Sequence, residues 1–342
     1  MRITYYVHDL SFPLVEGVRK QAWMLASAMQ KQGHLVTILS TSSKKNNRRT
    51  MVKEGITIRY GNPFSISKCK TDVLHYISHP SPLIIPLLYR AKAKRQIMTM
   101  YDGALNGFWK RWWDFITSSL VKAKVDTITL QADFQGKILQ KTRLNKMPLQ
   151  KIPPLIPLFK RTAEREKYPT LLFMSHLSKY KGIEEVLLSF SQARKEMKNL
   201  HLVICNSHIQ KNQYHSLLKK INKGDIIIKE KVNSQEELSK AWLYLYPIRK
   251  AQETFSIPLS LIEASQVGTT YISTAVGALP EYFSERYLVA PGNAVELSQR
   301  IVELLSKRKH NLKLKKKIDN KKTIAEFLKL YQNNRGKNEF KK

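Results

Sequence analysis

The sequence is poor in cysteine, in acidic residues and in long apolar runs. Its 342 residues include two cysteines, Cys69 and Cys205, which lie far apart and do not have the spacing of a metal site. A reduced, cytoplasmic setting is therefore predicted. No stretch approaches the ~20 consecutive apolar residues that span a bilayer, and the first residues, MRITYYVHD, lack the charged and then apolar run of a signal peptide. We expect neither a membrane-spanning helix nor a secretion signal.

Acidic residues are outnumbered by basic ones by more than two to one. The chain has 59 Lys and Arg against 26 Asp and Glu, a formal net charge of +33. Residues 1–160 carry a net +18, residues 161–305 a net +4 and residues 306–342 a net +11. We expect an anionic partner to meet the first half, and a basic surface that is merely solvated is the alternative. Charge alone also predicts non-specific binding to nucleic acid, but no nucleic-acid-binding module is recognised.

The length predicts two domains of roughly 150 residues each. In both halves, short apolar or β-branched runs alternate with segments of helical spacing, which indicates parallel βαβ units. Strands are expected at 3–8, 34–40, 56–60, 73–77, 96–100, 127–130, 170–174, 200–205, 225–229 and 243–246, and helices at 18–32, from 183 onward, and at 213–221, 235–240 and 318–331. Three prolines within residues 149–159 exclude a regular helix or a central strand, so we place the interdomain linker there. The expected domains are residues 1–150 and 151–317, followed by a C-terminal helix and basic tail, 318–342.

The segment from Glu253 to Glu281, ETFSIPLSLIEASQVGTTYISTAVGALPE, says the most about function. It contains an acid in a loop, a helix that begins near Pro258 and carries Glu263, a β-branched strand, and a glycine loop that enters another helix. Loops between strand ends and helix N-termini present backbone N–H groups to phosphate and sugar oxygens. Carboxylates accept hydrogen bonds from sugar hydroxyls. The segment therefore predicts a nucleotide-sugar pocket.

Three segments of the second half together resemble the retaining GT-B glycosyltransferases of family 4, the glycosyl transferases group 1. Residues 173–190, FMSHLSKYKGIEEVLLSF, are similar to that family's strand, G-R-L-x-x-x-K-G sequence and helix. Residues 253–264 are similar to its E-x-F-G and E-A element, and residues 276–281, VGALPE, to its V-G-G-x-P-E loop. The Gly33-His34 turn and the tail helix that ends at Tyr331 extend the resemblance to nearly the whole chain. It implies an α/β fold of two Rossmann-like domains facing a cleft, with the C-terminal helix crossing back onto an acceptor-side N-terminal domain.

The resemblance implies that the second domain binds the nucleotide-sugar donor. Lys181 corresponds to the lysine that neutralises the donor diphosphate, Glu263 to the glutamate that holds the ribose hydroxyls, and Glu253 to the acid at the sugar end. The backbone from Thr254 through Phe255 and Ser256 to Ile257 would present N–H groups to phosphate or hexose. The residues alone are also compatible with a surface lysine at 181, a helix-surface acid at 263 and, at 253, an acid that complements a helix dipole. Nine residues separate Glu253 from Glu263 where the family has seven, which displaces Glu253 from the family's sugar contact.

The phosphate side departs from the family motif at two positions. Ser175 and His176 replace the glycine and the arginine of G-R-L. A histidine can donate a hydrogen bond to phosphate, but it carries a full charge only when protonated. We expect His176 to contact the phosphate. Either donor affinity then depends on pH, or Arg249 or Lys250 compensates from the opposite loop.

The acceptor side departs as well. The family's double-glycine loop is reduced to Gly17, where a single glycine at a helix start still allows close backbone approach. In TMYDG, Tyr101 stands where the family often has a histidine, and Asp102 keeps the catalytic acid. The resemblance implies front-side transfer in which the donor phosphate takes the acceptor proton, so the missing histidine does not exclude catalysis. His8, His75 and His79 lie near predicted strand ends; each is a candidate replacement or a structural histidine.

No D-x-D motif occurs in the sequence, so no metal is predicted. Residues 105–124, LNGFWKRWWDFITSSLVKAK, combine aromatic residues and cations on one expected helix, which suits an anionic lipid interface. A helix packed in the core is the alternative. We expect a lipid-linked or otherwise anionic acceptor, peripheral contact with the inner face of a membrane, and no specific nucleic acid. A non-catalytic GT-B-like subunit remains the competing interpretation.

Overall fold

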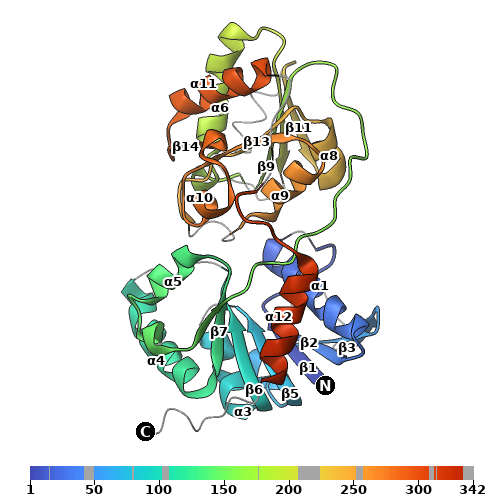
Figure 1. Cartoon of the computed structure of the whole chain (residues 1–342), viewed down its shortest axis with the longest axis vertical. Helices are drawn as coiled ribbons and strands as arrows, with labels where there is room; N and C mark the ends of the chain where they lie inside the picture. The colour runs from blue at the N-terminus through green and yellow to red at the C-terminus, as the bar shows by residue number, and fades with distance from the viewer. Residues whose placement is uncertain are drawn as a thin grey trace. The chain divides into compact units, whose positions relative to one another are not determined.

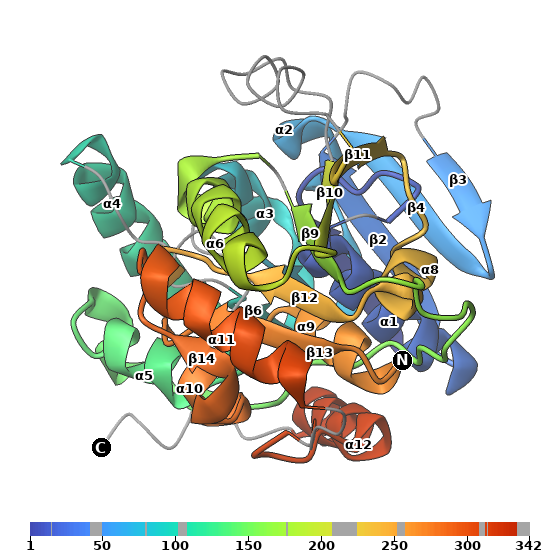
Figure 2. The same ribbon diagram turned by 90° about the horizontal axis from the view of Figure 1, so that it is seen from above.

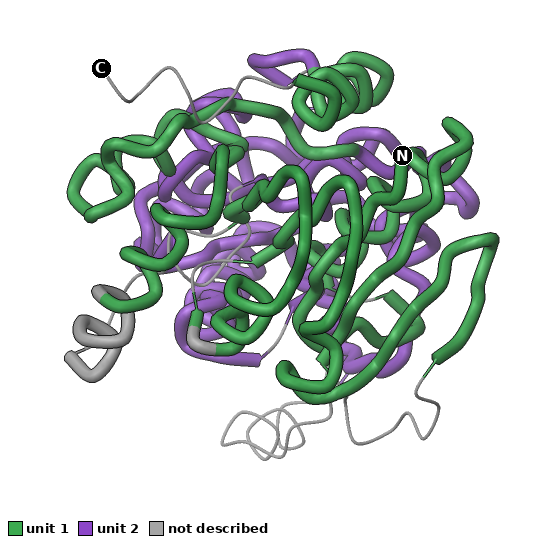
Figure 3. The backbone as a smooth tube through the Cα atoms, turned by 90° about the horizontal axis from the view of Figure 1, so that it is seen from below, with its two compact units in different colours: residues 1–155, 318–342 green, residues 156–317 purple. Residues whose placement is uncertain are grey.

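The chain divides into two compact units, residues 1–155 with 318–342, and residues 156–317 (Figure 3). The computed structural model describes residues 1–14, 16–41, 50–78, 81–101, 108–175, 177–206, 224–251, 257–307, 312 and 314–333, without the side chains of residues 82 and 108–115. The division between the units falls at Leu155, within the proline-containing segment. There the prolines cannot donate backbone hydrogen bonds to continue a sheet.

The described residues of unit 1 form an eight-stranded sheet in the order β3-β4-β2-β1-β5-β6-β7-β8. Its strands are β1 (Arg2–Val7), β2 (Leu35–Thr41), β3 (Thr50–Lys53), β4 (Ile56–Gly61), β5 (Lys70–Ile77), β6 (Lys92–Thr99), β7 (Thr127–Leu130) and β8 (Leu149–Lys151). Only β3, which pairs with β4, is antiparallel. The chain starts in the middle at β1, builds outward through β2 and β4, and then returns to β5 on the other side. A parallel sheet with this reversal is doubly wound, and its switch point lies between β1 and β5.

The helices of unit 1 connect these strands. They are α1 (Gly17–Lys31), α2 (Pro63–Ile66), η1 (Pro82–Ile84), α3 (Ile85–Arg90), α4 (Phe108–Lys124), α5 (Asp133–Leu139) and η2 (Arg143–Lys146). In α1 the buried residues recur every three or four positions, as in Ala22, Leu25 and Met29, so one face packs on the sheet. Gly33 follows the end of the helix, and its φ of 80° suits a residue without a Cβ.

The C-terminal helix α12 (Asn320–Gln332) belongs to unit 1 and lies beside α1 (Figure 1). Its Tyr331 hydroxyl lies 2.6 Å from Nδ1 of His75 on β5 and 3.2 Å from the Tyr5 hydroxyl on β1. The other ring nitrogen of His75 lies 2.6 Å from Oγ1 of Thr99 on β6. These buried groups satisfy one another, as buried polar groups must. The prediction that the tail helix crosses back onto the first domain is confirmed.

The described residues of unit 2 form a six-stranded sheet in the order β11-β10-β9-β12-β13-β14, with every pair parallel. The strands are β9 (Thr170–Ser175), β10 (His201–Asn206), β11 (Ile226–Glu230), β12 (Leu243–Tyr246), β13 (Thr270–Thr274) and β14 (Leu288–Val289). In the order of their appearance, this arrangement is 3-2-1-4-5-6, the Rossmann order. The predicted α/β class with two Rossmann-like sheets is therefore confirmed.

Helices cover both faces of this second sheet. The elements are η3 (Lys179–Lys181), α6 (Ile183–Glu196), α8 (Ser234–Lys240), α9 (Leu259–Gln266), α10 (Leu279–Tyr282), η5 (Glu285–Tyr287) and α11 (Ala294–Ser306). Helices α6 and α11 lie side by side over one face, and α8 and α9 lie over the other (Figures 1 and 2). The connection through α6 runs from β9 toward β10, and the connections through α8 and α9 run the opposite way along the sheet, so right-handed crossovers place them on opposite faces. The helix expected at 213–221 lies outside the described residues.

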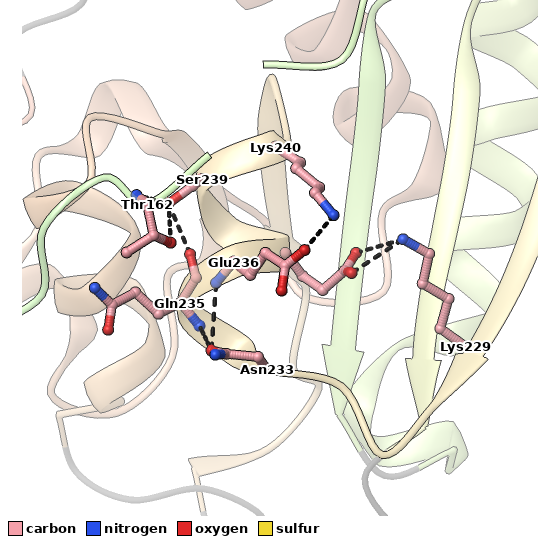
Figure 4. A network of polar contacts seen from close by, with 8 residues as sticks. Thr162, Lys229, Asn233, Gln235, Glu236, Ser239 and Lys240 are labelled. Atoms are coloured by element: carbon pink, nitrogen blue, oxygen red, sulfur yellow. Dashed lines mark hydrogen bonds and ion pairs between the residues drawn. The ribbon is translucent and has the colours of Figure 1, made fainter. Parts of the chain in front are cut away.

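The segment that enters unit 2 is held by hydrogen bonds rather than by regular structure. Arg161 donates to the carbonyls of Ser239 and Val267, and the Thr162 N–H donates to Oγ of Ser239 over 3.1 Å. Ser239 in turn donates to the Gln235 carbonyl within α8 (Figure 4). A guanidinium on the last carbonyls of α8 and α9 satisfies acceptors that a helix end leaves open. The entry to unit 2 thus fixes the C-terminus of α9.

The structure bears on one of the two expectations about membranes. Within the described part of the chain, no helix combines the length and the apolar character needed to cross a bilayer. The aromatic segment 105–124 contains helix α4, as expected from its spacing. The side chains of residues 108–115, with all three of its tryptophans, lie outside the description, so the interfacial role of this helix stays a prediction.

Candidate active site

The predicted donor residues that the structure describes gather at one edge of the unit 2 sheet. Lys181 follows β9, Ile257 and Glu263 follow β12, and the loop at residues 275–278 follows β13. Because β9, β12 and β13 are adjacent and parallel, their carboxyl ends meet at one edge. The reversal of strand order between β9 and β12 opens this edge, where doubly wound sheets bind ligands.

The turn between β9 and α6 is tightly built. The Lys181 N–H donates to the side chain of Ser178 over 3.3 Å, which closes the short helix η3. Gly182 then takes a φ of 80° and begins α6 without a side-chain cap. A methyl group added at Gly182 would lie 2.0 Å from the carbonyl oxygen of Pro247, in the loop after β12. Only glycine allows this approach, and the turn leaves the first N–H groups of α6 directed at the sheet edge.

Arg249 joins the two loops on either side of the switch point. Its N–H donates to the Tyr180 carbonyl over 2.9 Å. Its guanidinium donates over 2.5 Å to Glu185 and over 2.9 Å to Glu184, both in the first turn of α6. We expected Arg249 to compensate for a missing phosphate ligand; its charge is instead engaged by two carboxylates. Lys250 lies 4.9 Å from the centre of the Tyr180 ring, a cation–π distance that adds a further link between the loops.

Glu263 is buried in α9, with 2% of its surface exposed. It is close to Tyr244 of β12, whose hydroxyl donates to Oγ of Ser260 over 3.0 Å. Burial raises the pKa of Tyr244 well above its usual value, and the nearby charges of Tyr246 and Glu263 raise it further. A carboxylate this deep at the carboxyl edge is not a solvated surface acid. The structure therefore excludes the helix-surface interpretation of Glu263.

The loop after β13 reverses direction at Gly277, with a φ of 62°, and enters α10 through Pro280. Glu281 in the first turn of α10 pairs with Lys316 over 3.2 Å. Lys316 also lies 5.4 Å from the centre of the Tyr282 ring. These contacts tie the chain that leaves unit 2 toward α12 to the third of the predicted donor loops.

Several predicted site residues lie outside the described residues: Glu253, Thr254, Phe255, Ser256, His176, Asp102 and His79. Their roles stay predictions. Ile257, which ends the predicted phosphate-binding backbone, is described and fully buried. Lys181 is half-buried.

The switch point of unit 1 carries a second set of polar residues. His8 is exposed after β1, and its Nδ1 lies 2.8 Å from Oγ1 of Thr41. Asp9 has a φ of 48°, an uncommon value for a residue other than glycine that often marks a functional site. Its carboxylate pairs over 2.9 Å with Arg19 in the first turn of α1, the helix that Gly17 begins. Gly17 and His8 therefore share the carboxyl edge of the unit 1 sheet.

His75 and Tyr101 do not reach that edge with their side chains. His75 is fully buried in the network with Tyr331 and Thr99, and burial lowers its pKa to about 3. It is therefore a neutral structural histidine, and its candidacy as an acceptor-side residue was wrong. Tyr101 is 5% exposed, and burial raises the pKa of its hydroxyl. In place of the family histidine, the chain has a tyrosine that packs inward.

Sequence reasoning missed two features of these sites. The acid pair Glu184-Glu185 at the start of α6 could have suggested a cation from the facing loop, because acids at a helix start attract positive partners as well as the dipole. The strained Asp9 left no signal in the sequence. Among the described residues, no group of three or more His, Cys, Asp or Glu side chains is arranged to hold a metal ion.

Comparisons with known proteins agree with this geometry. Residues 157–321, nearly all of unit 2, match the family model described as glycosyl transferases group 1. No curated protein matches the sequence.

Solved structures show a similar fold at low sequence identity. Sucrose-phosphate synthase from Thermosynechococcus elongatus is 14% identical with a TM-score of 0.71 and 90% coverage of both chains. A TarM variant from S. aureus, in complex with fondaparinux, alpha-GlcNAc-glycerol and UDP, is 8% identical with a TM-score of 0.73, covering 97% of this chain and 100% of that one. HepE of Anabaena in complex with UDP-glucose is 11% identical with a TM-score of 0.67, covering 89% and 90%. Residues 157–321 thus match the glycosyl transferases group 1 in sequence, and the chain shares the GT-B fold of these solved structures.

Proposed function

We propose that the protein transfers a hexose from a nucleoside diphosphate sugar to an acceptor, with retention of anomeric configuration and without a metal. The observation that carries the proposal is that the buried Glu263 and the Lys181–Gly182 turn follow the two strands, β12 and β9, that flank the switch point of a Rossmann-ordered sheet. That edge lies in the segment that matches the glycosyl transferases group 1. Metal independence is supported by the lack of a D-x-D sequence.

In this proposal each donor residue has one electrostatic or hydrogen-bonding task. Glu263 accepts hydrogen bonds from the ribose hydroxyls, which a buried carboxylate does strongly. Lys181 and the first N–H groups of α6 offset the negative charge that grows on the departing diphosphate. Glu253, the backbone of residues 254–257 and His176 complete the contacts to sugar and phosphate.

The reaction exchanges one bond to the anomeric carbon. The acceptor oxygen attacks that carbon on the face that the diphosphate leaves, the carbon–oxygen bond to the diphosphate breaks, and the acceptor proton passes to a phosphate oxygen. The products are a glycoside with the donor's configuration and a nucleoside diphosphate. Since the phosphate takes the proton, the transfer does not require a histidine at Tyr101.

We place the acceptor at the carboxyl edge of the unit 1 sheet, where exposed His8 can contact a hydroxyl and Asp102 is expected nearby. The basic first half, with a net +18, favours an anionic or lipid-linked acceptor at the inner face of a membrane. The donor base is assigned by analogy: the similar TarM structure contains UDP and the HepE structure contains UDP-glucose. UDP-sugars are therefore the first donors to test.

The test is a thermal-shift screen with UDP-, GDP- and ADP-sugars, followed by measurement of donor hydrolysis and transfer. At a donor concentration 100 times Kd, binding stabilises the folded chain by about 2.7 kcal/mol, a shift of several degrees in Tm. Glu263→Gln and Lys181→Ala should abolish most of that shift. Lys179→Ala removes an exposed lysine from the same turn and is the matched control.

Two outcomes count against the proposal. If no nucleotide sugar raises Tm in the wild type, the donor site is refuted. If the wild type binds a donor but neither hydrolyses nor transfers it with any acceptor tested, the protein is a non-catalytic subunit with the GT-B fold.

A further inference from the structure

The connections that lead into β5 and β6 of the unit 1 sheet carry an exposed aromatic and basic surface. Phe64 of α2 is 66% exposed and Tyr89 of α3 is 61% exposed. Helices α2 and α3 are neighbours, and the Arg90 guanidinium donates to the Phe64 carbonyl over 3.3 Å. Two large aromatic side chains are therefore exposed to solvent on adjacent short helices, although such side chains are usually buried.

Exposed cations surround these two aromatic side chains. Lys70 begins β5 and pairs in register with Lys92, which begins β6, while Lys68 and Arg90 immediately precede these strands. All four are exposed, and the Lys92 N–H donates to the Cys69 carbonyl, so the two strand starts lie side by side. We name Phe64, Lys68, Lys70, Tyr89, Arg90 and Lys92 the aromatic–basic patch. Figure 1 shows α3 at the lower end of unit 1, and Figure 3 looks onto that end.

The sequence that contributes the patch is poor in acidic residues. Between residues 55 and 101 the sequence has seven Lys and Arg but one acid, Asp72. The Asp72 carboxylate is engaged by the Arg2 N–H over 2.8 Å and by Lys94 over 3.0 Å, so it does not neutralise the four patch cations. Cations that no carboxylate neutralises, mixed with aromatic side chains, are complementary to a surface that has a high density of negative charge over an apolar interior.

We propose that the aromatic–basic patch docks the protein on an anionic lipid bilayer. Phe64 and Tyr89 enter the boundary between headgroups and acyl chains, where the Tyr89 hydroxyl stays hydrated. The four cations lie on the headgroup phosphates. Each cation near an anionic leaflet contributes about 1 kcal/mol, or about fivefold in partitioning, and the contribution falls off within a Debye length. This inference gives a place to the membrane contact of the proposed function but does not depend on donor chemistry.

Co-sedimentation with vesicles of phosphatidylglycerol and phosphatidylcholine, against pure phosphatidylcholine vesicles, tests the proposal with the full-length chain. The wild type should bind the anionic vesicles at low salt and lose binding at high salt. Lys68→Gln with Lys70→Gln should weaken partitioning by roughly 25-fold at low salt, from about fivefold for each cation. Phe64→Ser with Tyr89→Ser should leave weak binding that moderate salt removes.

Matched controls change the same chemistry elsewhere. Lys195→Gln with Lys198→Gln removes two exposed cations from unit 2, and Leu158→Ser removes an apolar side chain that is 85% exposed. Both controls should bind vesicles as the wild type does. Tm and donor-induced thermal shifts of every variant report folding and the donor site, which keeps this proposal separate from glycosyl transfer.

Three results would overturn the assignment. The first is a wild type that does not bind anionic vesicles at low salt. The second is patch variants that partition like the controls, which would move the contact to another surface. The third is patch-dependent binding of single-stranded nucleic acid without vesicle binding, because aromatic side chains with cations can also stack on bases.

Discussion

The close approach of Gly182 to the Pro247 carbonyl gives the sharpest prediction about the donor site. In Gly182→Ala, the new methyl group would lie 2.0 Å from that oxygen and must push the two loops apart. The residue would also hold a φ of 80°, which suits glycine and penalises alanine. The substitution therefore strains the backbone and displaces the turn that carries Lys181.

The magnitude follows from these two costs. A left-handed conformation costs a residue with a Cβ about 1–2 kcal/mol, and forcing an extra methyl group into a packed site costs about 1–3 kcal/mol. Gly182→Ala should therefore destabilise the protein by about 2–5 kcal/mol. Gly33→Ala is the matched control, because Gly33 also has a φ of 80° but a methyl group there meets nothing within 4 Å. It should lose only the conformational part, about 1–2 kcal/mol.

Urea-induced unfolding of the two variants measures the difference, and the thermal shift with donor measures its effect on the site. Gly182→Ala should lose more stability than Gly33→Ala and should respond less to donor, because the displaced turn no longer holds Lys181 against the loop after β12. Equal losses of stability in the two variants, or an unchanged donor response in Gly182→Ala, would refute the reasoning.

Three further predictions concern interactions inside each unit. Burial lowers the pKa of His75 from 6.5 to about 3, so between these pH values only the unfolded chain takes up the His75 proton. The contribution of His75 to the free energy of unfolding is therefore complete above pH 6.5 and falls by about 1.4 kcal/mol per pH unit below it. His75→Asn should remove this slope from the free energies measured by urea titration. Arg249→Gln should raise the donor KM more than it lowers kcat. It also leaves the Glu185 carboxylate buried and unpaired, so adding Glu185→Gln should recover the lost free energy of unfolding. Arg161→Gln should cost about 2 kcal/mol in urea unfolding by freeing two helix-end carbonyls; a loss below about 0.5 kcal/mol would show that water replaces the guanidinium there.

Most of the strands and many of the helices could be predicted because their signals are local. Apolar runs such as Thr170–Ser175 and the stop at Gly33 fixed strand and helix positions to within a few residues. The short edge strands β3 and β8 were missed, since edge strands are half-exposed and lack a continuous apolar pattern. Strand β14 and helices α2, α3, α5 and α11 were also missed. Contacts between residues far apart in the sequence leave no local pattern. The hydrogen bond between His75 and Tyr331, which are 256 positions apart, could therefore not be predicted.

The same limit applies to the site. Lys181 and Glu263 could be proposed as site residues because each lies within a motif, whereas the partners of Arg249 depend on how two loops meet across a sheet. The burial of side chains in the structure distinguished between interpretations that the sequence left open. It shows that Glu263 lies in the interior of unit 2 and His75 in the interior of unit 1.

The length of β5 sets a distance between the two proposed tasks of unit 1, membrane docking and acceptor binding. From Lys70 in the aromatic–basic patch to Ile77 at the opposite edge, seven steps of about 3.3 Å span about 23 Å. A protein docked by that patch would carry its acceptor edge this far above the headgroups. A bare lipid headgroup could not reach it, but a glycan that already extends several sugars from its lipid could. The length of the strand would then select acceptors by the distance between their growing end and the membrane surface.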